Sequence, residues 1–170
     1  FGTAPAKSGL YDPLRDKDAC GLAMVATLRG TAGHDIVDMA LSSLRNLEHR
    51  GAVGSDAGTG DGAGILTQIP DRFFRKVLSF ELPKQGSYGA GLVFLSEKEA
   101  AKDKEQFAKI AKEEQLEVLG WKTPPTRPEV LGDLAKAAMP LIEQVFVSAV
   151  DQAKDLELER RLFRLRKRSE

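Results

Sequence analysis

One cysteine stands at the point where an irregular polar leader gives way to an apolar run. Cys20 is the single cysteine among 170 residues, and Gly21-Leu22-Ala23-Met24-Val25 follows it. A thiolate is a strong nucleophile for acyl transfer, and the small neighbours Ala19 and Gly21 leave room for an approaching substrate. A cysteine beginning a core strand is also commonly a small buried apolar residue. These residues alone therefore leave a nucleophile and a core residue both open.

Two other segments have the composition of a reactive or binding site. Leu47-Glu48-His49-Arg50-Gly51 brings basic side chains together before a glycine, and Thr59-Gly60-Asp61-Gly62-Ala63-Gly64 is rich in glycine. The first also fits a helix end, where His49 and Arg50 oppose the negative pole and Gly51 takes the left-handed capping conformation. The second fits either a flexible turn or a close-packed loop whose amides approach a ligand. It is not a P-loop, because no Gly-Lys-Ser/Thr follows.

Composition narrows the class of protein. The chain has 25 basic and 25 acidic residues and is 42% hydrophobic, which fits one ordinary soluble domain. A net charge of zero gives no general electrostatic attraction to nucleic acid or to an anionic membrane. One cysteine excludes an intrachain disulfide, and the sequence has no long apolar stretch and no secretory signal pattern. We therefore expect a cytoplasmic location.

Hydrophobic spacing and turn signals predict the elements that would position these residues. Residues 1–19 lack periodicity and are expected to form an extended surface leader. A buried strand is expected over residues 20–28, a helix over 35–49 and, after the glycine-rich loop, a strand over 65–69. A short helix is predicted from 70 to 77, followed by a strand over 88–95 that is covered on both faces. A capping box formed by Ser96 and Glu99 predicts the start of a charged helix that runs to about 115. Strands over 116–121 and 141–147 and a helix from 151 onward are also predicted.

Alternating strands and helices predict a layered α/β domain, with parallel and antiparallel strand order both open. Residues 156–168 form an amphipathic basic helix without a stop signal, so the chain is expected to be cut rather than finished. Without an aromatic platform, this basic helix fits a solvated or truncated helix end better than a nucleic-acid site.

Four motifs in this order and spacing resemble one family. Gly9-Leu10-Tyr11-Asp12-Pro13, Asp18-Ala19-Cys20-Gly21, residues 44–53 and residues 59–70 are similar to the amino-terminal region of glutamate synthase large (alpha) subunits. Residues 73–74, 120–125, 138–147 and 156–168 fit the same pattern, so the resemblance covers nearly the whole chain. That region of the family is a class II glutamine amidotransferase domain.

The resemblance implies an α+β fold of the N-terminal-nucleophile (Ntn) hydrolase type. In this four-layer αββα fold, two antiparallel sheets lie between helical layers, and the resemblance implies that the fold is incomplete at the C-terminal end of this chain. Residues 1–19 would be a leader or propeptide, and residues 20–170 the first part of the amidotransferase domain. Cleavage between Ala19 and Cys20 would make the cysteine the first residue of the mature protein.

The resemblance also implies a catalytic role for two residues. Cys20 would supply the nucleophilic thiolate, and its own α-amino group, with a reference pKa of about 7.7–8.0, would be the base. Arg50 would lie beside Cys20, order the site and favour the thiolate. L-Glutamine would be hydrolysed to glutamate and ammonia through a thioester. Gly51 and the loop over residues 60–64 would pack near the nucleophile without a catalytic step.

Cofactors and partners follow from the same resemblance. In a complete glutamate synthase, ammonia reaches 2-oxoglutarate at a distant FMN site, and electrons arrive through iron–sulfur centres; this fragment is expected to hold no cofactor and no metal. Expected partners are L-glutamine, the remaining glutamate synthase domains and a small NADPH-oxidising subunit, with no nucleic acid and no membrane. The electron donor stays open among NADPH, NADH and ferredoxin.

Two departures from the family pattern bear on activity. The His-Gln-Arg-Tyr-Ser-Thr stretch that grips the glutamine carboxylate and the Asn-Gly pair of the oxyanion hole do not occur in these residues. An attached leader would also acylate the Cys20 nitrogen that should act as base. We therefore expect the isolated chain to be inactive.

Two other functions are compatible with the sequence. One is a non-catalytic module in which the glycine loop binds an anion and the basic helix docks a partner. The other is an amidotransferase attached to a different synthase, which the Tyr11-Asp12-Pro13 leader and the block over residues 59–70 fit less well.

Overall fold

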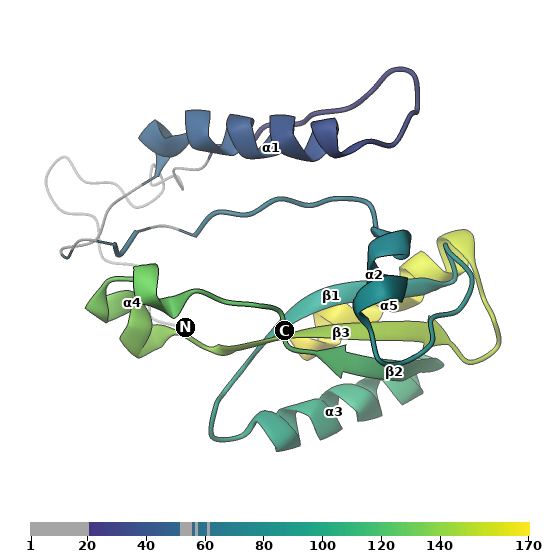
Figure 1. Ribbon diagram of the computed structural model, residues 1–170. Helices are drawn as coiled ribbons and strands as arrows, with labels where there is room; N and C mark the ends of the chain where they lie inside the picture. Colours follow the sequence, from purple (N-terminus) through teal and green to yellow (C-terminus); the bar gives the residue numbers. More distant parts are fainter. Residues whose placement is uncertain (1–20, 52–55, 57, 61) are drawn as a thin grey trace, which may run out of the picture. The chain divides into compact units, whose positions relative to one another are not determined.

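The computed structural model describes residues 21–51, 56, 58–60 and 62–170, so the predicted leader and Cys20 lie outside the described residues (Figure 1). The chain divides into two units, residues 1–66 and residues 67–170.

In the first unit, the helix predicted over residues 35–49 is confirmed as two consecutive pieces. Helix α1 spans His34–Asn46, and the 3₁₀ turn η2 spans Glu48–Arg50. Val37, Ala40 and Leu44 recur at helical spacing on the partly buried side of α1. Leu47 joins the two pieces, because its amide donates to the carbonyls of Ser43 and Leu44, both at 3.1 Å.

The left-handed cap predicted at Gly51 is wrong. Gly51 has φ −89° and ψ 159°, which is extended backbone. The helix ends earlier, because the chain tightens at Leu47 into a 3₁₀ turn in which the Arg50 amide donates to the Leu47 carbonyl at 2.8 Å. Such a turn satisfies carbonyls at a helix end without a left-handed residue.

The strands predicted over residues 20–28 and 65–69 are also wrong for the residues that the structure describes. Residues 21–28 and 65–69 belong to no strand, and Leu22 and Met24 are 93% and 91% exposed. A strand is stabilised by hydrogen bonds to a neighbour. In the described part of the chain, the three assigned strands pair only with each other. These two apolar runs therefore lack the partner that their composition requires.

The second unit is built on a three-stranded antiparallel sheet in the order β1-β3-β2 (Figure 1). The strands are β1 (Tyr88–Leu95), β2 (Leu116–Lys122) and β3 (Leu141–Ala149), which confirms the three predicted strands in this half of the chain. Tyr88 pairs with Ser148 and Leu95 with Leu141, so β1 is paired along its whole length. The strand order that the sequence left open is thus antiparallel.

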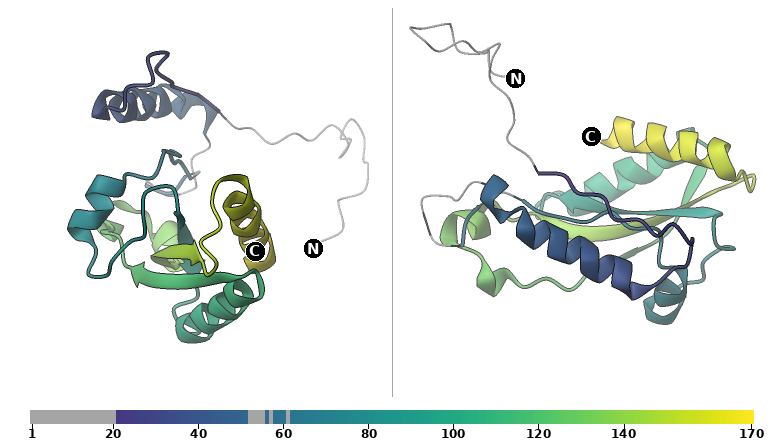
Figure 2. Two further views of the ribbon diagram at one scale, coloured as in Figure 1. Left: turned by 90° about the vertical axis from the view of Figure 1, so that its right-hand side faces the viewer. Right: turned by 90° about the horizontal axis from the view of Figure 1, so that it is seen from above.

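Two helices cover one face of this sheet. Helices α3 (Ala100–Glu113) and α5 (Asp155–Ser169) lie on the same side of the sheet, opposite α2 (Figure 2). Period-two alternation turns Val145, Val147 and Ala149 of β3 toward these helices. The buried cluster on this face consists of Phe107, Ile110, Ala111, Leu116, Val145, Val147, Ala149, Leu158 and Leu165.

Trp121 packs at the edge of this cluster. Its ring meets Phe107 edge-on, with centroids 5.4 Å apart, and Lys104 Nζ lies 5.0 Å from the Trp121 ring centroid. The same ammonium group donates to Glu143 Oε1 at 2.9 Å. The indole therefore sits between an aromatic ring and a paired cation, a geometry that favours both contacts.

The opposite face is covered over part of its length by α2 (Asp71–Val77) and the segment after it, which confirms the predicted short helix. Phe146 of β3 is fully buried there, with ring centroids 5.0 Å from Phe74 and 5.5 Å from Phe80. Farther along β1, Leu92 and Phe94 are 54% and 65% exposed. The prediction that β1 is covered on both faces is therefore wrong at the C-terminal end of this strand.

The predicted capping box at the start of α3 is not formed. Glu99 is the N-cap residue and makes no side-chain capping bond. Instead, the Asp103 carboxylate accepts a hydrogen bond from the Ser96 amide at 3.4 Å. The Asp103 carboxylate, one turn into the helix, thus binds the backbone amide of Ser96, which precedes the helix. Its negative charge is also favourable at the positive end of the helix dipole.

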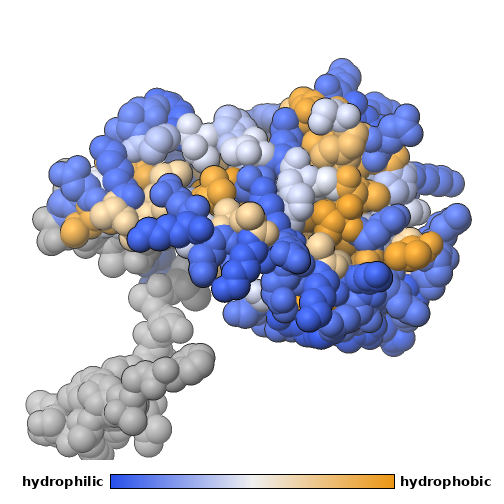
Figure 3. Space-filling view, turned by 90° about the horizontal axis from the view of Figure 1, so that it is seen from below, coloured by the Kyte–Doolittle hydropathy of each residue, from blue (hydrophilic) through white to orange (hydrophobic). Residues whose placement is uncertain are grey.

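The connection between β2 and β3 holds two short elements that the sequence did not predict. They are the 3₁₀ turn η3 (Pro128–Val130) and helix α4 (Asp133–Ala138). Val130 and Leu134, in these two elements, are exposed. Figure 3, a view of the molecule from below, shows exposed apolar residues (orange) among hydrophilic ones (blue). Both elements are shorter than the window in which helical periodicity is detectable.

A buried arginine ties the loops at one end of the sheet. Arg161 is 6% exposed and donates to both oxygens of Asp151 at 2.9 Å and to Glu157 at 3.1 Å. This pairing lowers the pKa of Asp151, mainly through the hydrogen bond from Arg161. Because the two carboxylates are half exposed, most of the desolvation falls on the guanidinium. The arrangement fixes the turn between β3 and α5 against the first turns of α5.

A second polar cluster joins α2 to β1. Asp71 accepts hydrogen bonds from Tyr88 Oη at 3.0 Å and from Arg75 Nε at 2.9 Å, and Arg75 Nη1 donates to the Leu82 carbonyl at 2.9 Å. The hydrogen bond from Arg75 lowers the pKa of Asp71. Burial, together with the hydrogen bond to Asp71, raises the pKa of Tyr88 to about 12.

We predict that Tyr88 stabilises the fold below pH 10 and that this stabilisation is lost as pH rises toward about 12, because the folded state holds the phenol proton above its ordinary value of 10.0. The variant Tyr11→Phe leaves Tyr88 as the one tyrosine of the chain. Its phenolate absorbance, followed together with circular dichroism, should titrate near 12 while folded and near 10 in urea. Asp71→Asn should move the folded midpoint only part of the way, since burial is the largest cause. A folded midpoint near 10 would contradict this assignment.

Gly120 of β2 predicts a second stability effect. A Cβ at this position would lie 2.5 Å from Phe80 Cε1, whereas a Cβ at Gly91 of β1 would meet nothing within 4 Å. Gly120→Ala should therefore lower the free energy of unfolding by about 1–3 kcal/mol in urea denaturation. The matched control Gly91→Ala should be neutral or slightly stabilising. Equal effects of the two substitutions would show that the Phe80 contact does not constrain Gly120.

Candidate functional site

The residue that follows Cys20 lies against the predicted site arginine. A Cβ at Gly21 would be 3.1 Å from Leu47 Cδ2, 3.3 Å from Leu47 Cβ and 3.3 Å from Arg50 Cβ. The first unit therefore brings the described backbone next to Cys20 together with the end of α1 and η2. Cys20 itself lies outside the described residues, so its position relative to Arg50 stays a prediction.

Backbone hydrogen bonds hold the segment that carries Arg50. The Leu47 amide is bonded to α1, the Arg50 amide to the Leu47 carbonyl at 2.8 Å, and the Gly51 amide to the Glu48 carbonyl at 3.1 Å. Arg50 is exposed to solvent, while Leu47 is partly buried. The backbone of Arg50 is thus fixed by η2, and its side chain extends from this turn on the side that solvent reaches.

His49 forms a hydrogen bond with the C-terminal end of α1, as predicted by the interpretation of this segment as a helix end. Its Nδ1 lies 3.0 Å from the Asn46 carbonyl oxygen, which can only accept, so Nδ1 carries the proton. An imidazole at the last carbonyls of a helix is a favourable placement. Of the two basic residues His49 and Arg50, Arg50 is the one whose Cβ lies close to Gly21.

The glycine-rich loop is open around Gly62 and Gly64. Nothing lies within 4 Å of a Cβ placed at Gly62 or at Gly64. Thr59 Oγ1 donates to Asp56 Oδ2 at 3.0 Å, which is a local turn contact. Among the described residues, these contacts fit the open-turn alternative, and the predicted packing of the loop near Cys20 stays a prediction.

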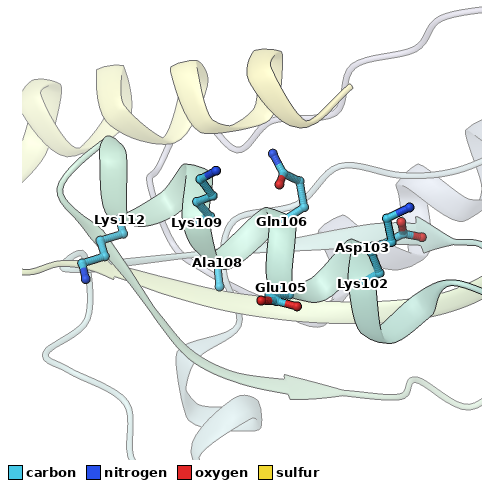
Figure 4. Close-up of a pocket in the computed structure, with 7 residues that line it drawn as sticks. All are labelled: Lys102, Asp103, Glu105, Gln106, Ala108, Lys109 and Lys112. Atoms are coloured by element: carbon cyan, nitrogen blue, oxygen red, sulfur yellow. The ribbon is translucent and has the colours of Figure 1, made fainter.

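No other cluster in the described residues competes as a site. These residues include no group of three or more His, Cys, Asp or Glu arranged to hold a metal ion. Within the same part of the chain, every helix is too short or too polar to cross a membrane. The hollow in Figure 4 is lined by residues of one helix, α3, among them three lysines and two carboxylates: Lys102, Asp103, Glu105, Gln106, Ala108, Lys109 and Lys112. One exposed helix face of mixed charge gives no chemistry to assign.

The sequence predicted Arg50 as a site residue, and it did not predict the contact of Leu47 with Gly21. The contact between Leu47 and Gly21 joins segments far apart in the chain, and spacing alone does not reveal such a contact. The sequence features that could have predicted this contact are the glycine directly after Cys20 and the large apolar residue Leu47 at the helix end.

Comparison with known proteins gives a consistent result. The family of class II glutamine amidotransferases matches residues 20–170, so the match begins at Cys20. The large chain of glutamate synthase [NADPH] from Bacillus subtilis (strain 168) is 43% identical over 174 residues, covering 100% of this chain and 11% of that protein. The ferredoxin-dependent glutamate synthase of Pyropia yezoensis is 40% identical over 166 residues, covering 96% of this chain and 11% of that protein.

A relative whose name gives a third electron donor, NADH, has a comparable sequence identity to this chain. Glutamate synthase [NADH] from Saccharomyces cerevisiae (strain ATCC 204508 / S288c) is 39% identical over 170 residues, covering 94% of this chain and 8% of that protein. The chain thus spans 8–11% of the length of these three relatives. Their names cover NADPH, NADH and ferredoxin, so similarity over this region does not distinguish the electron donor.

Proposed function

The chain belongs to the class II glutamine amidotransferase family, and from this premise we propose that it is the first part of the glutamine-hydrolysing domain of a glutamate synthase. The observation that carries the proposal is the contact of Gly21 with Leu47 and Arg50. It joins the residue after the proposed nucleophile to the proposed site arginine. The similarity to glutamate synthases over nearly the whole chain supports the assignment to that enzyme.

The proposed chemistry is acyl transfer through a cysteine. Removal of residues 1–19 frees the α-amino group of Cys20, which takes the thiol proton. The thiolate attacks the side-chain amide carbon of L-glutamine, the C–N bond breaks, and the leaving nitrogen is protonated and departs as ammonia. Water then hydrolyses the thioester to glutamate and restores the thiol. Arg50 orders the site and favours the thiolate by its positive charge.

The proposed fold is the four-layer αββα Ntn hydrolase arrangement, with residues 20–170 as its first part. Two features of the second unit support it: an antiparallel sheet with helices α3 and α5 on one face, and exposed Leu92 and Phe94 on the other. An uncovered apolar sheet face is expected where a second sheet packs.

The proposed whole protein uses FMN and iron–sulfur clusters, and it passes ammonia to 2-oxoglutarate. The residues here do not fit an iron–sulfur cluster, because clusters of this kind are held by several cysteines and the chain has one. We assign these cofactors to other domains of the polypeptide. We also propose a cytoplasmic location, with the remaining domains and a small NADPH-oxidising subunit as partners.

We predict that the full-length polypeptide releases ammonia from glutamine and that Cys20→Ala abolishes the release, because the thioester cannot form. Mass spectrometry should find the mature N-terminus at Cys20 and labelling of Cys20 by a glutamine-analogue electrophile. The isolated 170-residue chain should show no turnover, since it lacks the oxyanion donors and the carboxylate-binding arginine. An uncleaved terminus with an inert thiol would instead favour the non-catalytic module.

We predict that Arg50→Gln raises the pH at which Cys20 becomes reactive. Loss of a nearby positive charge disfavours the thiolate, and the expected shift in the pH profile of alkylation is about one unit or more. Arg50→Lys should shift the profile less, because the charge is kept. Arg45→Gln is the matched control, since Arg45 lies in the last turn of α1 and bonds Ser42 at 3.3 Å. Identical profiles for the Arg50→Gln and Arg45→Gln variants would remove Arg50 from the site.

A further inference from the structure

We propose that Gly21 and Leu47 form a steric stop that sets the spacing between the backbone after Cys20 and Arg50. Gly21 and Leu47 are then positioning residues for the cysteine, and neither takes part in a chemical step. This inference rests on the proposed glutaminase function and deepens it.

The distances at Gly21 make the fit of an added side chain tight. A Cβ would lie 3.1 Å from Leu47 Cδ2 and 3.3 Å from both Leu47 Cβ and Arg50 Cβ. Carbon atoms attract best at about 3.5–4.0 Å, so an added methyl group would require the backbone or its neighbours to give way by a few tenths of an ångström. A side chain at position 21 therefore fits only if the backbone or Leu47 shifts by a few tenths of an ångström.

Glycine is favoured at position 21 because of the neighbouring side chains, and not because of the backbone dihedral angles at that position. The described glycines with positive φ are Gly30, Gly58 and Gly86, and Gly21 is not among them. An alanine could therefore adopt the same backbone conformation without strain. Only the contacts with Leu47 and Arg50 oppose it, so the effect of a substitution should depend on what occupies position 47.

Leu47 is the less yielding side of this contact. Its amide is bonded to the Ser43 and Leu44 carbonyls, and its carbonyl accepts from the Arg50 amide at 2.8 Å. Leu47 is partly buried, whereas Gly21 is exposed. An added side chain at position 21 is thus expected to displace the chain that leads to Cys20 rather than the helix end that carries Arg50.

Displacement of a nucleophile affects turnover more than substrate binding. A misplacement of about 1 Å can cost about 10²-fold in rate. We expect Gly21→Ala to lower kcat several-fold and the bulkier Gly21→Val to lower it by about 10²-fold, with little change in KM for glutamine. The rate of Cys20 alkylation should fall in the same order.

The test is a double-variant comparison in the full-length polypeptide. Leu47→Ala removes Cδ2, the atom in closest contact, so Gly21→Ala combined with Leu47→Ala should recover part of the kcat and of the alkylation rate lost in Gly21→Ala alone. Gly91→Ala is the matched control, because a Cβ there meets nothing within 4 Å, and it should leave kcat unchanged. Recovery in the double variant would support the steric stop even if Gly21→Val failed to fold.

Two outcomes would overturn the proposal. One is a Gly21→Ala variant with unchanged kcat and unchanged alkylation, and the other is a double variant whose losses add without recovery. Failure of the proposed function is separate, since it would appear as ammonia release by the unsubstituted protein that Cys20→Ala does not reduce. The alkylation series reports the position of Cys20 in either case.

Discussion

Strand β3 must bury both of its faces and pair along both of its edges, and the second unit is arranged around this requirement. Its neighbours β1 and β2 hydrogen-bond to either side, and residues 145–149 are all buried. Phe146 meets α2 and the segment after it on one face, while Val145 and Val147 meet α3 and α5 on the other. Since the alternation of side chains fixes which residue faces which layer, a shift of β3 by one residue would exchange the two cores.

Two polar clusters of this unit lie where strands lead into connections. Arg161 holds the turn after β3, and the cluster of Asp71, Arg75 and Tyr88 holds α2 against the start of β1. Each cluster joins elements that the apolar core already brings together. Their contribution is thus to fix loop geometry, whereas burial of apolar surface supplies most of the stability.

Sequence patterns predicted the second unit better than the first. Residues 88–95, 116–122 and 141–149 are strands as expected, because these strands pair with one another inside the chain. Residues 21–28 have similar composition but no assigned partner strand among the described residues. The cap at Gly51 and the capping box at Ser96 failed for a different reason: each helix end had two ways to satisfy its backbone groups, and spacing does not distinguish them. For the site, motif resemblance predicts Cys20 and Arg50, whereas the contact of Gly21 with Leu47 depends on packing between segments distant in the sequence.

Trp121 has a consequence for optical measurements on this chain. It is the one tryptophan of the sequence, and it packs between Phe107 and Lys104 in the second unit. Intrinsic indole emission therefore reports how α3 sits on the sheet of the second unit. The two units can be followed separately by adding a second fluorophore to α1, with Trp121 as the built-in reporter of the other unit.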